Sequence, residues 1–108
     1  MSSARQVVTF RNVNEWFVAL GRKWREVAAR RDARFEEPVL DAKVAEELLE
    51  LARVAAHTKE RRFAPLASFV AGIAAERLRR AKGGASAEQV AAYIREVREE
   101  LEREAPPS

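Results

Sequence analysis

The sequence predicts an all-α protein, a compact single domain of four helices (a helical bundle) over residues 1–108, with an apolar third helix at its centre. Apolar residues recur at spacings of three and four along four segments, and capping residues or prolines stand near the segment starts. The one strand-like run, QVVTF at residues 6–10, is too short and isolated to form a sheet. We expect helices over 13–30, 41–57, 65–81 and 87–104, with flexible tails at 1–11 and 105–108.

The first helix is predicted from a capping pair, Asn12 with Glu15 three residues later. Gly21 inside it costs about 1 kcal/mol relative to alanine, which indicates close packing at that point. The apolar stripe that follows the cap consists of Val13, Trp16, Phe17, Leu20, Trp24, Val27 and Ala28.

The second helix begins after Pro38, with Asp41 as its N-cap. It ends near His57 and Thr58, because HTKERRF has no periodicity and Ala64 precedes a proline. Its stripe is Leu40, Val44, Leu48, Leu51, Ala52 and Ala55.

The third helix opens with Pro65 in its first turn and is apolar on nearly every side as far as Glu76. Small residues stand between its large ones and would let neighbouring backbones approach, so we expect the other helices to cover it. Gly83 and Gly84 end it.

The fourth helix starts at a capping box made by Ser86 and Gln89. We expect exposed ion pairs from Arg95 to Glu99 and from Glu99 to Arg103. Its apolar stripe is narrow, so in an alternative arrangement this helix pairs with a second copy of the chain. The expected core is Trp16, Leu20, Leu48, Leu51, Phe69, Val70, Ile73 and Tyr93.

Composition excludes several classes of function. With 47% apolar and 34% charged residues, the chain is too hydrophobic for a disordered segment. It has no cysteine and one histidine, which excludes disulfides, thiolate metal sites and a cysteine nucleophile. The longest uncharged run, residues 63–75, is shorter than the about 20 residues of a membrane span, and the N-terminus lacks a signal-peptide pattern. We expect a cytoplasmic protein with no metal, no cofactor and no membrane contact.

Charge alternates along the chain. Residues 1–35, 36–58, 59–84 and 85–108 carry net charges of +5, −4, +5 and −3. This pattern is typical of helices that pack with complementary flanks. It also allows a basic face for phosphates or an acidic partner, although no helix here is suited to reading bases. That face would consist of Arg22, Lys23, Arg25, Arg30, Arg31, Arg77, Arg79, Arg80 and Lys82.

The candidate binding site is the basic connection after the second helix, formed by His57, Lys59, Arg61 and Arg62. In one interpretation it binds an anion or a partner, because an arginine pair suits a carboxylate or phosphate. In the other, His57 caps its own helix and the rest is a solvated loop. The sequence identifies no general acid and general base in different environments. The glycine-containing segment KGGAS at residues 82–86 has neither the strand before it nor the Lys-Ser/Thr pair after it that a phosphate-binding loop needs. We therefore expect no enzyme.

Two segments, LLELARVAAH at 48–57 and RRFAPLASFVAGIAA at 61–75, and the NEW tripeptide at 14–16 carry a family resemblance. The chain resembles a family of small uncharacterised bacterial helical domains found fused or adjacent to molybdenum-cofactor guanylyltransferases. The resemblance implies an accessory role. We therefore expect a non-catalytic accessory or interaction protein that binds a protein partner, and the alternative is a nucleic-acid-binding protein that uses the basic helical face. The matching positions are Trp16, Leu48, Leu49, Leu51, Ala52, Arg53, Ala56, His57, Ala64, Pro65, Leu66, Phe69 and Gly72.

Overall fold

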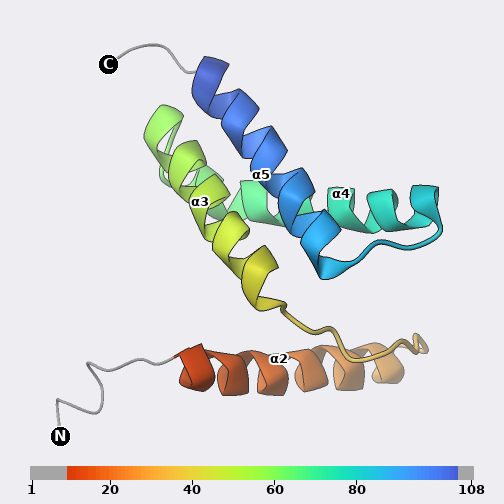
Figure 1. Ribbon diagram of the computed structural model, residues 1–108. Helices are drawn as coiled ribbons and strands as arrows, with labels where there is room; N and C mark the ends of the chain where they lie inside the picture. The colour runs from red at the N-terminus through yellow and green to blue at the C-terminus, as the bar shows by residue number, and fades with distance from the viewer. Residues whose placement is uncertain (1–9, 105–108) are drawn as a thin grey trace, which may run out of the picture. The chain divides into compact units, whose positions relative to one another are not determined.

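The computed structural model describes residues 10–104, and these form four α-helices and no strand (Figure 1). The all-α, four-helix prediction is confirmed. The chain divides into two compact units, of which the first ends at Leu40 and the second begins at Asp41, and each is described by itself. The assignment of residues 1–108 to one domain stays a prediction. The helices are α2 (Phe10–Arg30), α3 (Ala42–Thr58), α4 (Phe63–Lys82) and α5 (Ala87–Glu104).

Helix α2 begins earlier than the sequence predicts. Because it starts at Phe10, Asn12 lies inside the helix and is not its N-cap. Residues 10 and 11, which were predicted to belong to the flexible tail, are helical. The remainder of that tail and of QVVTF, like the tail at 105–108, lies outside the described residues. Helix α4 begins two residues before Pro65, which keeps this proline in the first turn, where a missing N–H costs no hydrogen bond.

Three other predicted helix termini are confirmed: the starts of α3 and α5 and the end of α4. The carboxylate of Asp41 accepts from the backbone N–H groups of Lys43 and Val44, at 2.9 and 3.1 Å. Ser86 and Gln89 form the reciprocal capping box, with donor–acceptor distances of 2.8 and 3.1 Å. At the end of α4, Gly83 adopts the left-handed conformation with φ of 72°. Local sequence therefore determines where these helices start and stop.

In the first unit, the segment after α2 folds back along the helix. A left-handed residue, Asp32 with φ of 64°, follows the helix end. The carbonyl oxygen of Pro38 then lies against Gly21, in the space that a Cβ would occupy, and Arg25 Nη1 lies 3.6 Å from Glu37 Oε1. The close packing predicted at Gly21 is confirmed, and its partner is a backbone carbonyl.

In the second unit, α3 and α5 lie side by side and α4 crosses behind them (Figure 1). Leu51 from α3 and Val90 and Ile94 from α5 form the buried core. Val90 is 1% exposed. The half-buried residues packed against this core are Val44, Leu48, Ala67, Ala71, Ala75 and Ala85.

Helix α4 does not take the central, covered position that its apolar sequence predicts. None of its residues is fully buried, and α3 packs more extensively than α4 does against the other helices of the unit. The alanine row of α4 faces the core, because only small side chains let the helix backbones approach this closely. The large side chains on its other faces remain exposed: Leu66 (61%), Phe69 (70%), Val70 (60%) and Ile73 (40%).

The predicted core is therefore only partly correct. Leu51 is buried, and Leu20, Leu48 and Tyr93 are half-buried. Trp16 is 61% exposed, contrary to the prediction. Phe69, Val70 and Ile73 are exposed for the reason given above, since the alanines take the core-facing positions of α4.

Candidate functional site

The predicted binding residues are all exposed: His57 lies in the last turn of α3, and Lys59, Arg61 and Arg62 lie in the connection between α3 and α4. Backbone bonds tighten this connection, from Phe63 N to the carbonyl of residue 60 at 2.9 Å and from the next amide to that of residue 61 at 3.1 Å. The connection therefore presents three basic side chains on a short ordered turn, and His57 precedes them at the end of α3.

His57 does not cap α3. The hydroxyl of Thr58 donates instead to the carbonyl of Val54 at 2.8 Å, and the backbone N–H of Lys59 donates to the carbonyl of Ala55 at 3.1 Å. These two bonds satisfy carbonyls that the last turn of a helix leaves free. The imidazole is consequently not required for the helix end.

The two arginines of the connection differ in their surroundings. Arg62 Nε lies 2.6 Å from Glu60 Oε1, so its charge is already paired. Within residues 10–104, neither Lys59 nor Arg61 forms an ion pair. Arg61 and Lys59 are thus the cations of this connection that remain available to an anionic group.

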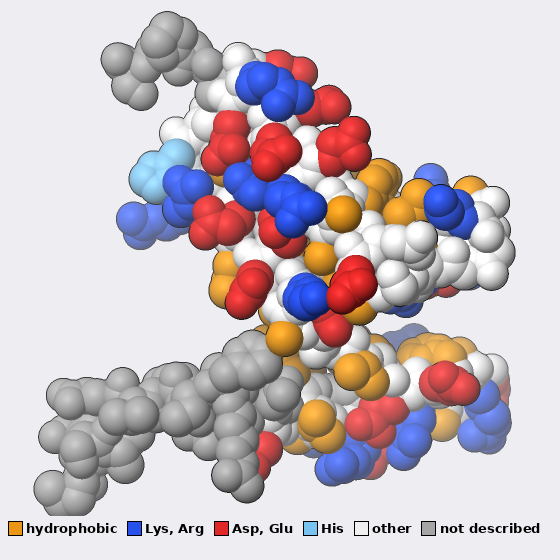
Figure 2. All heavy atoms as spheres, viewed as in Figure 1, with side chains coloured by type: hydrophobic (Ala, Val, Ile, Leu, Met, Phe, Trp, Pro, Cys, Tyr) orange, Lys and Arg blue, Asp and Glu red, His pale blue; other side chains and the backbone are white. Residues whose placement is uncertain are grey.

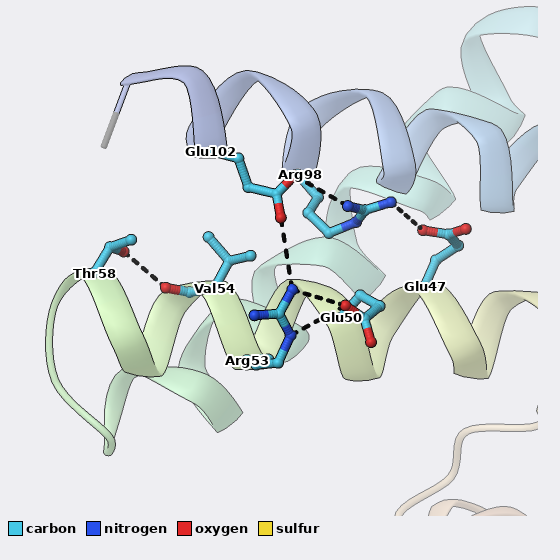
Figure 3. Close-up of polar contacts among 7 residues, drawn as sticks. All are labelled: Glu47, Glu50, Arg53, Val54, Thr58, Arg98 and Glu102. Atoms are coloured by element: carbon cyan, nitrogen blue, oxygen red, sulfur yellow. Dashed lines mark hydrogen bonds and ion pairs between the residues drawn. The ribbon is translucent and has the colours of Figure 1, made fainter. Parts of the chain in front are cut away.

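A network of charged side chains joins α3 to α5 (Figure 3). Arg98 on α5 lies between two carboxylates, 3.4 Å from Glu47 on α3 and 3.1 Å from Glu102 on its own helix. Arg53 on α3 lies 2.9 Å from Glu50 and 3.6 Å from Glu102. These contacts cross between the helices at two points, so the network fixes α5 against α3.

This network replaces the exposed pairs that the sequence predicts on α5. Arg95 lies 3.8 Å from Glu47 across the helix interface and is not paired with Glu99. Arg98 is only 15% exposed, and its Nε is buried without a hydrogen-bond partner. On the face that α3 and α5 present, basic and acidic side chains alternate closely (Figure 2). The charge pairs of this network therefore join α5 to α3.

An apolar groove of about 500 Å³ lies between α4 and α5, with Leu51 and Ala55 of α3 contributing to its lining. All of its lining side chains are hydrocarbon except Tyr93. The α4 side is formed by Phe63, Leu66, Ala67, Val70, Ala71 and Ala74, and the α5 side by Tyr93, Ile94, Val97 and Leu101.

One side of the groove is bordered by carboxylates. Glu96, Glu100 and Glu104 follow each other at intervals of four along α5, and each stands three residues after a groove-lining residue. Residues three apart are neighbours on a helix surface, so these exposed side chains form an acidic rim beside the groove. The groove therefore combines an apolar interior with negative charge along its α5 edge.

Sequence reasoning missed this groove because it assigned Phe69, Val70 and Ile73 to the core. The signal was present in α4, which carries two rows of apolar residues, alanines at 67, 71 and 75 and larger side chains at 66, 70 and 73. A helix that packs with one face can bury only one of these rows. Leu66 and Val70 of the second row line the groove.

A family model described as a domain of unknown function (DUF6457) matches residues 10–108. The chain belongs to this family. The match spans all four helices, so the DUF6457 domain includes the groove, the basic connection and the α3–α5 network. Neither the curated proteins nor the solved structures gave a match.

Two further observations concern the described part of this DUF6457 domain. None of its helices is long and apolar enough to cross a membrane. In residues 10–104, no three His, Asp or Glu side chains gather in a way that could hold a metal ion.

Proposed function

We propose that this domain is a non-catalytic interaction module that binds an amphipathic helix in the groove between α4 and α5. The observation that carries the proposal is the apolar lining, in which Leu66, Val70, Val97 and Leu101 remain 40% or more exposed. Fully burying one such side chain contributes about 1.5 to 3 kcal/mol. Apolar surface gathered in one groove is typical of sites that bind a partner helix.

The acidic rim specifies the occupant further. A helix in the groove would face Glu96, Glu100 and Glu104 with one of its flanks. Like charges brought together there would oppose binding, whereas lysine or arginine would favour it. The occupant in this proposal is therefore a helix with an apolar face and a basic flank.

The test uses a synthetic peptide of about 18 residues, five helical turns, with leucine on one face and lysine on the other. Wild-type protein should bind it, and Val70→Asp should weaken binding at least about tenfold because a carboxylate would be buried against leucine. Leu49→Asp is the matched control, since Leu49 is 72% exposed and lies outside the groove. Equal peptide affinity in Val70→Asp and the wild type would refute the groove as the site.

In this proposal the module serves as an accessory protein in molybdenum-cofactor handling. The resemblance of residues 48–57 and 61–75 to domains fused or adjacent to molybdenum-cofactor guanylyltransferases supports this link. The basic connection is the surface proposed for that enzyme, because Arg61 and Lys59 are exposed and have no ion pair within residues 10–104. Carboxylates or phosphates are the groups that such cations bind.

A double substitution tests this surface. Arg61→Gln with Arg62→Gln should leave the melting temperature nearly unchanged, because Arg62 makes only an exposed pair with Glu60. Binding of the purified guanylyltransferase, measured by calorimetry, should weaken. A variant that melts several degrees lower and still binds the enzyme would assign the arginines a structural role.

Nucleic-acid binding is a second candidate, favoured by the exposed cations Arg77, Arg79, Arg80 and Lys82 near the end of α4. A phosphate-driven binder loses orders of magnitude in affinity between about 50 and 200 mM salt. Titration of mixed DNA and RNA at both salt concentrations decides this candidate. Undetectable binding at the lower concentration eliminates it.

A further inference from the structure

Helix α2 carries an apolar stripe whose two tryptophans stay exposed, while its other two side chains are half-buried. Trp16, Leu20, Trp24 and Val27 recur at intervals of four, four and three, which places them on one face. Trp16 and Trp24 are 61% and 59% exposed. The segment that folds back along α2 reaches Gly21 and Arg25, which are not part of this stripe. Two tryptophans thus remain free to anchor a contact with another surface.

The stripe and the groove match in length. From Trp16 to Val27 is eleven residues, and from Phe63 to Ala74, along the α4 side of the groove, is also eleven. Both correspond to about 17 Å of helix. The ring of Phe17 meets Trp16 edge-to-face, at 4.9 Å between centroids and 84° between planes, and supports the anchor from the side.

The stripe and the groove also match in charge. Lys23 stands three residues after Leu20, and Arg30 stands three residues after Val27, so both cations lie beside the stripe. Both are exposed and form no ion pair within the described residues. Helix α2 therefore has the apolar face and the basic flank that the groove and its acidic rim require.

We propose that the groove of one copy holds α2 of a second copy, so that the chain forms a dimer by reciprocal exchange of this helix. The inference rests on the proposed helix-binding function of the groove and names its occupant. A second copy fits because one chain supplies both complementary surfaces, and a two-fold axis satisfies both at once. Two such contacts, each covering two tryptophans and the side chains opposite, bury on the order of 1,200 Å² or more, the size of a stable interface.

Sedimentation velocity over a dilution series tests the dimer with full-length chains. Wild type should dissociate only on dilution, whereas Val70→Asp alone, and Trp16→Ala with Trp24→Ala, should each be monomeric throughout. An equimolar mixture of the groove variant and the tryptophan variant should associate again, because one groove and one α2 remain intact. Leu49→Asp should behave like wild type, and circular dichroism of each variant checks that the helices are retained.

Charge exchange tests the orientation of the contact. Lys23→Glu with Arg30→Glu should raise the dissociation constant at least about tenfold, because like charges would face the acidic rim. Adding Glu96→Lys and Glu100→Lys to the same chain should restore most of the affinity. A loss without rescue would overturn the placement of the basic flank of α2 beside α5.

Failure of this inference can be distinguished from failure of the proposed function. A wild type that is monomeric at every concentration, but binds the leucine–lysine peptide through Val70, overturns the second copy and leaves the helix-binding groove. A dimer that survives both the groove and the tryptophan variants overturns this mode of assembly. A wild type that stays monomeric and binds the peptide with the same affinity as Val70→Asp overturns both the dimer and the helix-binding groove.

Discussion

Replacing glycine by alanine should have opposite effects on stability at Gly21 and Gly72, the two glycines that lie inside helices. In the helix interior, Gly→Ala stabilises by roughly 0.5 to 1 kcal/mol, because alanine loses less conformational freedom on folding. At Gly72 an added Cβ meets no atom within 4 Å, so Gly72→Ala should gain this amount. At Gly21 the added Cβ would collide with the carbonyl oxygen of Pro38, a backbone atom that cannot rotate away.

The expected magnitude follows from these two terms. Overpacking costs about 1 to 3 kcal/mol, which exceeds the helical gain and leaves Gly21→Ala destabilising by about 1 kcal/mol. The cheapest response is release of the segment that folds back along α2, and 1 kcal/mol corresponds to about a fivefold larger released fraction. Helix α2 itself should persist, since alanine favours helix.

Two measurements separate these effects. Glutamyl endopeptidase should cleave after Glu36 about five times faster in Gly21→Ala than in wild type, if cleavage follows the open fraction. Urea unfolding followed by circular dichroism should show Gly72→Ala to be more stable than wild type. Equal cleavage rates in Gly21→Ala and wild type, or the same sign of stability change at both glycines, would refute the close-approach argument.

Three further predictions concern the second unit. Leu51→Ala should lower the free energy of unfolding by about 2 to 5 kcal/mol, since Leu51 is 6% exposed, whereas Leu49→Ala should stay within about 0.5 kcal/mol, both measured by urea titration. Asp41→Ala should cost about 1 kcal/mol in the same assay and lower the helicity of α3, because two amide groups lose their acceptor. The hydrogen bond and charge of Lys43, 2.8 Å from Glu88, lower the pKa of Glu88 from its usual 4.5, and those of Glu88 raise the pKa of Lys43 from 10.5. The contribution of Glu88 to the free energy of unfolding is therefore present above pH 4.5 and is lost as the pH falls through its lowered pKa. The contribution of Lys43 is present below pH 10.5 and is lost as the pH rises through its raised pKa. Because the pair is exposed, Glu88→Gln should change the pH dependence of the whole protein's melting temperature only slightly. High salt should abolish the difference in melting temperature between the variant and the wild type.

The sequence was sufficient to predict the four helices and several of their ends, because those ends depend on near neighbours. Asp41 accepts from amides two and three residues away, and the box of Ser86 and Gln89 closes over three residues. Gly21 could also be interpreted as a close approach, although the sequence did not identify Pro38 as its partner. Interactions between residues only a few positions apart can be predicted from the sequence alone.

The arrangement of the helices was predicted less well, because it depends on which of several apolar rows is buried. The sequence offers α4 a row of alanines and a row of larger side chains, and hydrophobicity alone favours burial of the larger row. Close approach to α3 favours the alanines, and this left Val70 and Ile73 outside the core. Arg98 was missed for a similar reason, since its partner Glu47 stands fifty-one residues away in the sequence.

The functional surfaces were predicted in part. The basic connection from His57 to Arg62 is exposed as one interpretation requires, but pairing of Arg62 with Glu60 leaves Lys59 and Arg61 as its unpaired cations. The groove required knowledge of how α4 and α5 cross, which no local pattern supplies. Its acidic rim, by contrast, is visible in the spacing of Glu96, Glu100 and Glu104.

The alanine row of α4 also sets how the second unit opens. Helices α3 and α5 share the buried leucine, valine and isoleucine core and the ion-pair network, whereas α4 is held by small side chains that lose little apolar contact on leaving. Segments with few buried contacts open first, at a fraction of the global unfolding free energy. Amide hydrogens of α4 should therefore exchange with deuterium before those of α3 and α5. A helix seated in the groove should slow exchange most in α4, which makes this helix a reporter of occupancy.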